Sequence, residues 1–155
     1  MPSAPPLSTL REERELMDAL FALMQREQNS LVAADIDELT ALTASKAALV
    51  AQLAACAKLR HDALAAAGFA PREEGMEAWL AACGDADAGA QWSALLALTR
   101  AAKEQNRLNG MLVNKHLAHT QGALNSMRPA AQGGNFYGPS GQTTGSAASR
   151  RLVIG

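Results

Sequence analysis

Apolar side chains recur at helical spacing along most of the chain before Pro129. In the first stretch they recur at intervals of three, four and seven residues, which is the spacing of one face of a helix. Ser8 is a candidate N-cap, because its hydroxyl can accept a hydrogen bond from an N–H group of the first turn. The pattern predicts a long helix over residues 8–33, with one apolar stripe made of Leu10, Met17, Leu20, Met24 and Leu31.

The pattern restarts at Asp35, which is suited to cap a new helix with Glu38 three residues later. We therefore predict a tight turn here and a second helix, antiparallel to the first, that ends at Gly68. One uninterrupted helix is the alternative, because residues 34–38 contain neither glycine nor proline. Lys46 lies within the second stripe, and we expect its ammonium group to reach water along its own stem. The stripe consists of Ile36, Leu39, Leu42, Leu49, Val50, Leu53, Cys56 and Leu64.

A short helix is predicted over residues 73–83, with Met76, Trp79 and Leu80 facing inward, followed by a loop over residues 84–87. A third long helix follows from Trp92 to Met127 and is closed by Pro129. Its stripe contains Trp92, Leu95, Thr99, Ala102, Asn106, Asn109, Val113, His116 or Leu117, Thr120, Leu124 and Met127.

Two amides three residues apart, Asn106 and Asn109, interrupt this apolar stripe, and Gly110 follows them. One interpretation is that the amides fix the register of the helix in its own bundle, and this is the one we favour. The other is that they form hydrogen bonds to another protein. Gly110 either lets another helix approach closely or loosens the helix where a partner inserts.

Alanine and leucine dominate the composition, while aromatic and β-branched residues are few, which favours helices over strands. The expected fold is all-α: an elongated antiparallel bundle of three long helices and a short one, over residues 1–128. Residues 129–155 are rich in glycine, serine and glutamine. Such a segment buries too little apolar surface to offset its ordering entropy, so we expect a flexible C-terminal tail.

The net charge of −1 is the sum of an acidic and a basic part of the chain. Through Ala88 there are seven more acidic than basic residues, and from Gly89 onward there are six more basic than acidic residues. The interpretation we favour is a basic third helix that packs against two acidic ones. A basic patch for nucleic acid or anionic lipid is the alternative. Its cations are spread singly, so we expect no nucleic-acid partner.

No catalytic or metal-binding pattern is found in the sequence. His116 and His119 are spaced to share a helix face, but two nitrogens are half a zinc site and no carboxylate or thiol lies nearby in sequence. We expect no enzyme activity, metal or cofactor. Cys56 and Cys83 are expected to stay reduced. No apolar run approaches the roughly 20 residues that span a bilayer, and no signal-peptide pattern begins the chain, so a cytoplasmic protein is expected.

The chain has two long helices, then N-x-x-N-G at Asn106, Asn109 and Gly110, then Y-G-P-x-G-Q from Tyr137 to Gln142, and a basic end. In this order the features resemble the FlgN family of flagellar export chaperones. The resemblance implies a cytosolic chaperone that holds the C-terminal helical segments of hook-associated proteins, which form the hook-filament junction. It also implies that the chaperone prevents their premature assembly and delivers them to the gate of the flagellar type III export apparatus, without a nucleotide or cofactor for holding them.

By analogy with that family, the client-binding side is the C-terminal portion, where an amphipathic client helix would lie on an apolar stripe. Tyr137, the only tyrosine, is the candidate for docking at the export gate; its alternative role is that of an ordinary turn residue. The candidate client-binding residues are Leu112, Val113, Leu117, Leu124 and Met127.

Other functions stay open at this point. The heptad spacing also suits a structural or adaptor bundle that associates with itself. The basic half suits a binder of anionic surfaces, whose binding would weaken steeply with added salt. A sibling flagellar chaperone with a filament or cap protein as its client is a closer alternative. The sequence leaves open the preferred client, the choice between monomer and homodimer, and whether the tail covers the client groove.

Overall fold

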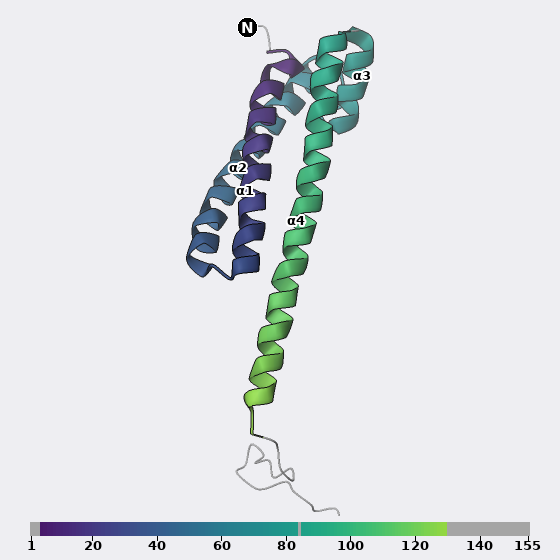
Figure 1. Ribbon diagram of the computed structural model, residues 1–155. Helices are drawn as coiled ribbons and strands as arrows, with labels where there is room; N and C mark the ends of the chain where they lie inside the picture. Colours follow the sequence, from purple (N-terminus) through teal and green to yellow (C-terminus); the bar gives the residue numbers. More distant parts are fainter. Residues whose placement is uncertain (1–3, 84, 130–155) are drawn as a thin grey trace, which may run out of the picture. The chain divides into compact units, whose positions relative to one another are not determined.

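The computed structural model describes residues 4–83 and 85–129 (Figure 1). A 3-10 turn, Pro6–Thr9, precedes four α-helices, and no strand occurs in the described residues. The predicted all-α fold of three long helices and one short helix is confirmed. The chain divides into two compact units, Met1–Lys115 and His116–Gly155, and the packed bundle belongs to the first. The helices are α1 (Leu10–Ala33), α2 (Ile36–Ala66), α3 (Glu73–Cys83) and α4 (Ala86–Met127).

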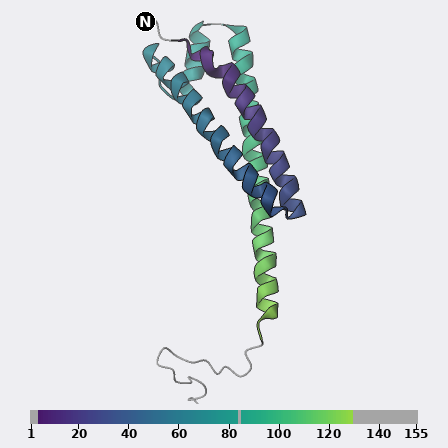
Figure 2. The same ribbon diagram turned by 90° about the vertical axis from the view of Figure 1, so that its left-hand side faces the viewer.

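The first two helices form an antiparallel hairpin through the turn that the sequence predicts (Figure 2). Ala34 adopts a left-handed φ of 55°, which ends α1. The Asp35 side chain then accepts a hydrogen bond of 3.1 Å from the backbone N–H of Glu38, which caps α2. The alternative of one uninterrupted helix is therefore wrong. Gly68, with φ of 87°, follows the end of α2 as expected.

Two predicted helix boundaries are wrong. α1 begins at Leu10, because Ser8 belongs to a 3-10 turn in which its N–H donates to the carbonyl oxygen of Pro5 at 2.9 Å. α4 begins at Ala86 and not at Trp92. Asp85 accounts for the earlier start, since its carboxylate accepts the N–H of Asp87 at 3.0 Å and caps the helix there.

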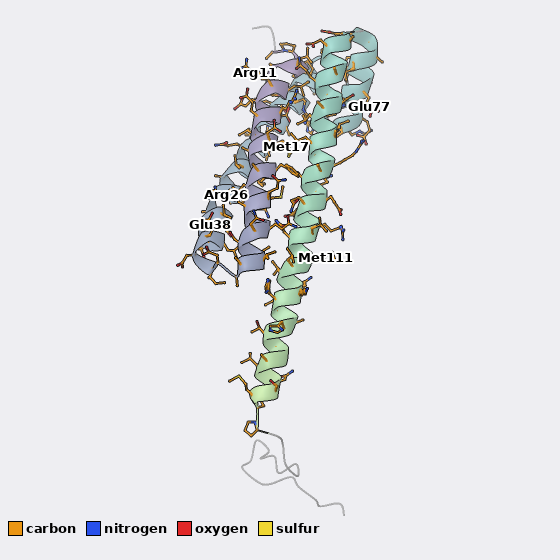
Figure 3. The ribbon with its side chains drawn as sticks, viewed as in Figure 1. Arg11, Met17, Arg26, Glu38, Glu77 and Met111 are labelled. Carbon is orange, nitrogen blue, oxygen red and sulfur yellow. The ribbon has the colours of Figure 1, made fainter. Side chains whose placement is uncertain are left out.

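The core has two parts. The larger cluster joins all four α-helices at the end of the bundle that contains α3, and the smaller cluster joins α1 and α4 through Leu20, Met24 and Ala102. Met17 of α1 packs against both clusters from the side of the helix that faces α4 (Figure 3). α3 therefore contributes to the core at one end of the bundle only. The larger cluster contains Leu10, Leu64, Met76, Trp79, Ala88, Trp92 and Leu95.

The apolar stripe predicted for α2 is wider than the surface that α2 buries. Leu42, Cys56 and Leu64 are buried, whereas Ile36 and Val50 are 68% and 50% exposed. The spacing of apolar residues shows which face of a helix avoids water, but not how much of that face a neighbouring helix covers. Part of the stripe on α2 is therefore left without a neighbour in the described residues.

By length and composition, α2 is apolar enough to cross a membrane, contrary to the sequence-based expectation that no stretch is. A single helix that meets this criterion is weak evidence for a membrane segment. Within the bundle α2 carries Lys46 and Arg60, and both form ion pairs with α1. Ion pairs of this kind are expected of a helix that packs in a protein bundle.

The expected pairing of a basic α4 with acidic α1 and α2 is not found in the described residues. The ion pairs between helices connect α1 to α2 and α2 to α3, as in Arg26–Glu38 and Arg60–Glu73. The described ion pair of α4 joins Arg107 to Glu104 on the same helix. The cations of α4 otherwise face solvent.

The two cysteines are free thiols, as expected. Cys56 is buried on α2, where desolvation and the nearby carboxylates of Glu12 and Glu13 raise its pKa. A buried thiol with a raised pKa stays protonated at neutral pH and behaves as a small apolar side chain. Cys83 is exposed at the end of α3.

A buried ion pair joins the hairpin at the α3 end. The side chains of Glu13 and Arg60 are each only 4% exposed, and Arg60 Nη2 lies 3.0 Å from Glu13 Oε1. Thr9 donates a hydrogen bond to the same carboxylate at 3.0 Å. The guanidinium also reaches Glu73 of α3 at 3.4 Å and stacks over the Trp92 ring at 4.8 Å from its centroid.

We predict that Glu13→Gln destabilises the protein by about 3 kcal/mol, because it leaves the charge of Arg60 buried without its main partner. Urea unfolding followed by circular dichroism measures the change. The control is Glu15→Gln, which breaks an exposed pair with Arg11 on the same helix and should change stability by less than about 1 kcal/mol. Equal effects of the two substitutions would contradict a special role for the buried pair.

Candidate functional site

The amide motif of α4 lies at the interface between α4 and the hairpin. Asn109 is 3% exposed, and its Nδ2 donates to the carbonyl oxygen of Met24 at 2.8 Å and to Glu27 Oε2 at 2.7 Å. Its Oδ1 accepts a hydrogen bond from Gln105 at 3.0 Å. Both donor hydrogens and the acceptor of this amide are thus used within the chain.

Lys46 of α2 completes a polar network around the motif. Its ammonium lies 3.1 Å from Glu27 Oε2 and 2.8 Å from Asn106 Oδ1. The side chains of Lys46 and Glu27 are only 27% and 16% exposed. The expectation that this lysine reaches water along its own stem is therefore wrong, because a carboxylate of α1 and an amide of α4 lie within its reach.

The network connects three helices at one level, with Glu27 on α1, Lys46 on α2 and the two amides on α4. Such contacts have strict geometry and tolerate no slip of α4 by a residue. The arrangement of Asn109 fits the interpretation in which the motif fixes helix register. Asn106 is different, because it is exposed and, within the described residues, only its Oδ1 forms a side-chain hydrogen bond.

Beyond the network, the same helix carries large apolar side chains that the described residues cover only in part. Val113 is 41% exposed, Leu117 63%, Leu124 54% and Met127 79%. Leu112 is half-buried, and Met111, labelled in Figure 3, is exposed. Of these residues, those up to Val113 belong to the first compact unit and those from Leu117 to the second. An apolar stripe that stays in water on both units is typical of a protein-binding surface.

A protein-family model described as FlgN protein matches residues 4–145. This chain belongs to the FlgN family. The match spans the described helices and also both sequence motifs. Neither the curated proteins nor the solved structures include a match to this chain.

FlgN proteins form a family of flagellar export chaperones, not of enzymes, and they are soluble cytoplasmic proteins that bind other flagellar proteins. The general role that the sequence implied is thereby confirmed. In the described part of this FlgN chain, no group of three or more His, Cys, Asp or Glu residues is arranged to hold a metal ion.

The remaining candidate residues are Gly110, which the structure describes, and Tyr137, which it does not. Gly110 has open space around it, since a Cβ added there would meet no atom within 4 Å. Packing within the described residues therefore does not require a glycine at this position. Tyr137 lies outside the described residues, and its assignment to gate docking stays a prediction.

The sequence pattern did not reveal Glu27 and Lys46 as members of the site. A signal for Lys46 was present, because it is a charged residue within an apolar stripe. Glu27 carried no such signal, since an acidic residue on an amphipathic helix normally faces water. Its partner Asn109 is 82 positions away in the sequence, and only the fold brings the two together.

We predict that Asn109→Ala destabilises the protein by about 2 kcal/mol, because it removes the two hydrogen bonds that the buried amide donates to Met24 and Glu27 and leaves the Gln105 amide without its acceptor. Urea unfolding measures the effect. Asn114→Ala, at an exposed position of the same helix, is the matched control and should change stability by less than about 0.5 kcal/mol. A loss for Asn109→Ala as small as that of the control would show that the network does not hold α4.

Proposed function

We propose that this protein is a cytoplasmic chaperone for hook-associated flagellar proteins, and that it holds a C-terminal helical segment of the client on the exposed stripe of α4. The observation that supports this proposal is the exposure of Val113, Leu117, Leu124 and Met127, whereas the earlier stripe residues Trp92, Leu95, Ala102 and Asn109 are buried. An amphipathic client helix would remove these side chains from water, as in other helix-in-groove complexes. Holding the client in this way would block its assembly contacts until export.

The composition of the stripe suits more than one client. Met127 has a flexible, polarisable side chain that adapts to different neighbours. The last described part of α4, from Gln105 onward, contains basic residues and no acidic one. A client helix with acidic residues beside its apolar stripe would therefore be favoured over a basic one.

Delivery is the second part of the proposal. Tyr137, in the Tyr137–Gln142 motif, would dock at the membrane-embedded component of the export gate. Gate docking and client holding would then use different segments of the chain, so that one chaperone molecule engages both partners at once. Neither step needs a nucleotide or a metal ion in this mechanism.

A self-associating bundle without an export role is the second candidate function. The same exposed side chains favour it, because Val113, Leu117, Leu124 and Met127 also suit pairing with a second copy of α4. Sedimentation of the free protein over a range of concentrations separates the two. Helical oligomers that form without client, together with no client binding, would favour the structural bundle.

We predict that Leu117→Asp lowers the affinity for the C-terminal segments of hook-associated proteins at least about tenfold, because it places a charge in an apolar contact. Titration calorimetry of the purified proteins measures the affinity. Thermal unfolding should not change, since the side chain is already 63% exposed. His119→Asp introduces the same charge on the opposite face of α4 and should bind client normally; if both variants bind as wild type, the stripe is not the client site.

We predict that Tyr137→Ala leaves client affinity unchanged and weakens docking at the export gate about tenfold, as expected when an aromatic anchor is lost from a protein interface. Binding of the chaperone–client complex to the purified cytoplasmic domain of the gate component measures the docking. Tyr137→Phe is the matched control, because it keeps the ring and removes only the hydroxyl. Docking that is the same for Tyr137→Ala and wild type would reject the assignment.

A further inference from the structure

A second uncovered apolar surface lies within the first compact unit, in a cleft of about 430 Å³ between α2 and α4. Met17 of α1 lines its floor. Val50 and Leu53 line the α2 wall, while Leu95 and Leu96 line the α4 wall. The cleft is separate from the stripe at the end of α4, and none of the candidate client-binding residues lines it.

The cleft exists because α3 is short. Met76 and Trp79 of α3 pack with Leu64 of α2 and Trp92 of α4, so α3 occupies the fourth position of a four-helix bundle. It does so for only 11 residues, or about 16 Å, whereas the 24 residues of α1 extend about 36 Å. Glu73, the first residue of α3, lines the cleft. Beyond Glu73 the fourth position is empty in the described residues.

The dimensions of the cleft fit one more helix. Its α4 wall runs from Trp92 to Lys103, which is about 16 Å along a helix axis or about three turns. On the α2 wall, Ala54 and Ala57 are small, so the backbone of an added helix can approach closely. Val50, which is 50% exposed, would be covered by such a helix.

The charges at the cleft define which helix fits. Glu73 is 56% exposed at one end, where it pairs with Arg60 and lies 3.4 Å from His61. Lys103 lines the other end, is exposed, and forms no ion pair within the described residues. The complementary helix has an apolar stripe and an acidic residue opposite Lys103, because an unpaired cation at the rim of an interface selects an anionic partner.

We propose that the cleft receives an amphipathic helix of about three turns from the client protein, which completes the bundle as its fourth helix. The proposal rests on the proposed function, because it assigns the occupant to the client. It adds a second contact: one client helix lies on the exposed stripe of α4 and another fills the cleft. The client thereby covers both apolar surfaces that the chaperone leaves in water.

The test is to fill the cleft and measure client affinity. Ala54→Trp inserts an indole into the cleft from an exposed position of α2, so no buried contact is removed. Ala55→Trp is the matched control, since Ala55 is also exposed on α2 and does not line the cleft. Titration calorimetry with the C-terminal segments of hook-associated proteins should show at least about tenfold weaker binding for Ala54→Trp and wild-type binding for Ala55→Trp.

A second pair of variants tests whether Lys103 contacts an acidic residue of the client. Lys103→Glu should lower client affinity several-fold, and the loss should shrink at high salt. Arg100→Glu is the control, because Arg100 is exposed on α4 and does not line the cleft. Circular dichroism and thermal unfolding of all four variants establish that they are folded before binding is compared.

The outcomes separate this inference from the proposed function. Client binding that Leu117→Asp weakens and Ala54→Trp leaves unchanged would overturn the inference while the proposed function stands. No client binding by the wild-type protein would overturn both. Self-association that Ala54→Trp abolishes, without client binding, would show that a second copy of this chain occupies the cleft and would overturn the assignment to a client.

Discussion

The buried charge of Arg60 needs partners inside the bundle, and the positions of these partners constrain how the four helices are arranged. The guanidinium is 4% exposed, and a buried cation without a partner would cost several kcal/mol. Its partners come from every other helix: Glu13 on α1, Glu73 on α3 and the ring of Trp92 on α4. Alternative registers of these helices would break at least one of the contacts. The ion pair therefore contributes specificity, even where an apolar replacement of similar size would contribute as much stability.

A second polar level lies further along the bundle, where Glu27, Lys46 and Asn109 connect the three long helices. Two fixed levels on the same three helices prevent α4 from sliding or rotating against the hairpin. The apolar contacts between the levels then need not be extensive to keep the helices in register. The fold can thus leave an apolar cleft between α2 and α4 without collapsing into it, as the proposed binding of a client helix requires.

Periodicity was sufficient to predict the helices, because their apolar stripes are long and regular. It also located the turn at Asp35 and the end of α2 at Gly68, where single residues have strong local preferences. It failed where the outcome depends on contacts between distant parts of the chain. Val50 belongs to the apolar stripe of α2 and is nevertheless half exposed, because α3 is too short to reach it. A stripe predicts what avoids water, not which helix covers it.

The polar members of the interior were harder to predict than the apolar ones. Arg60 lies at helical spacing between Cys56 and Leu64, so its place on the buried face was visible in the sequence. Glu13, its partner, lies 47 positions away among other acidic residues of the first helix, and nothing local distinguishes it from them. The two amides of α4 and Lys46 of α2 were conspicuous as polar residues on apolar stripes, but Glu27 of α1 was not.

The magnitudes of burial and association indicate why a holding chaperone would use two surfaces. Burying a fully exposed side chain of this size contributes about 1.5–3 kcal/mol. Val113, Leu117, Leu124 and Met127 are 41–79% exposed, so each contributes only part of that amount. Association costs about 4–15 kcal/mol in lost freedom. The two terms are of similar size, so a client helix on this stripe alone would bind weakly. A second helix of the same client in the cleft would raise the overall affinity, because the second contact would form at a high effective concentration. Two weak contacts would also separate one at a time, so under the proposed function a client could be released without the energy of a nucleotide.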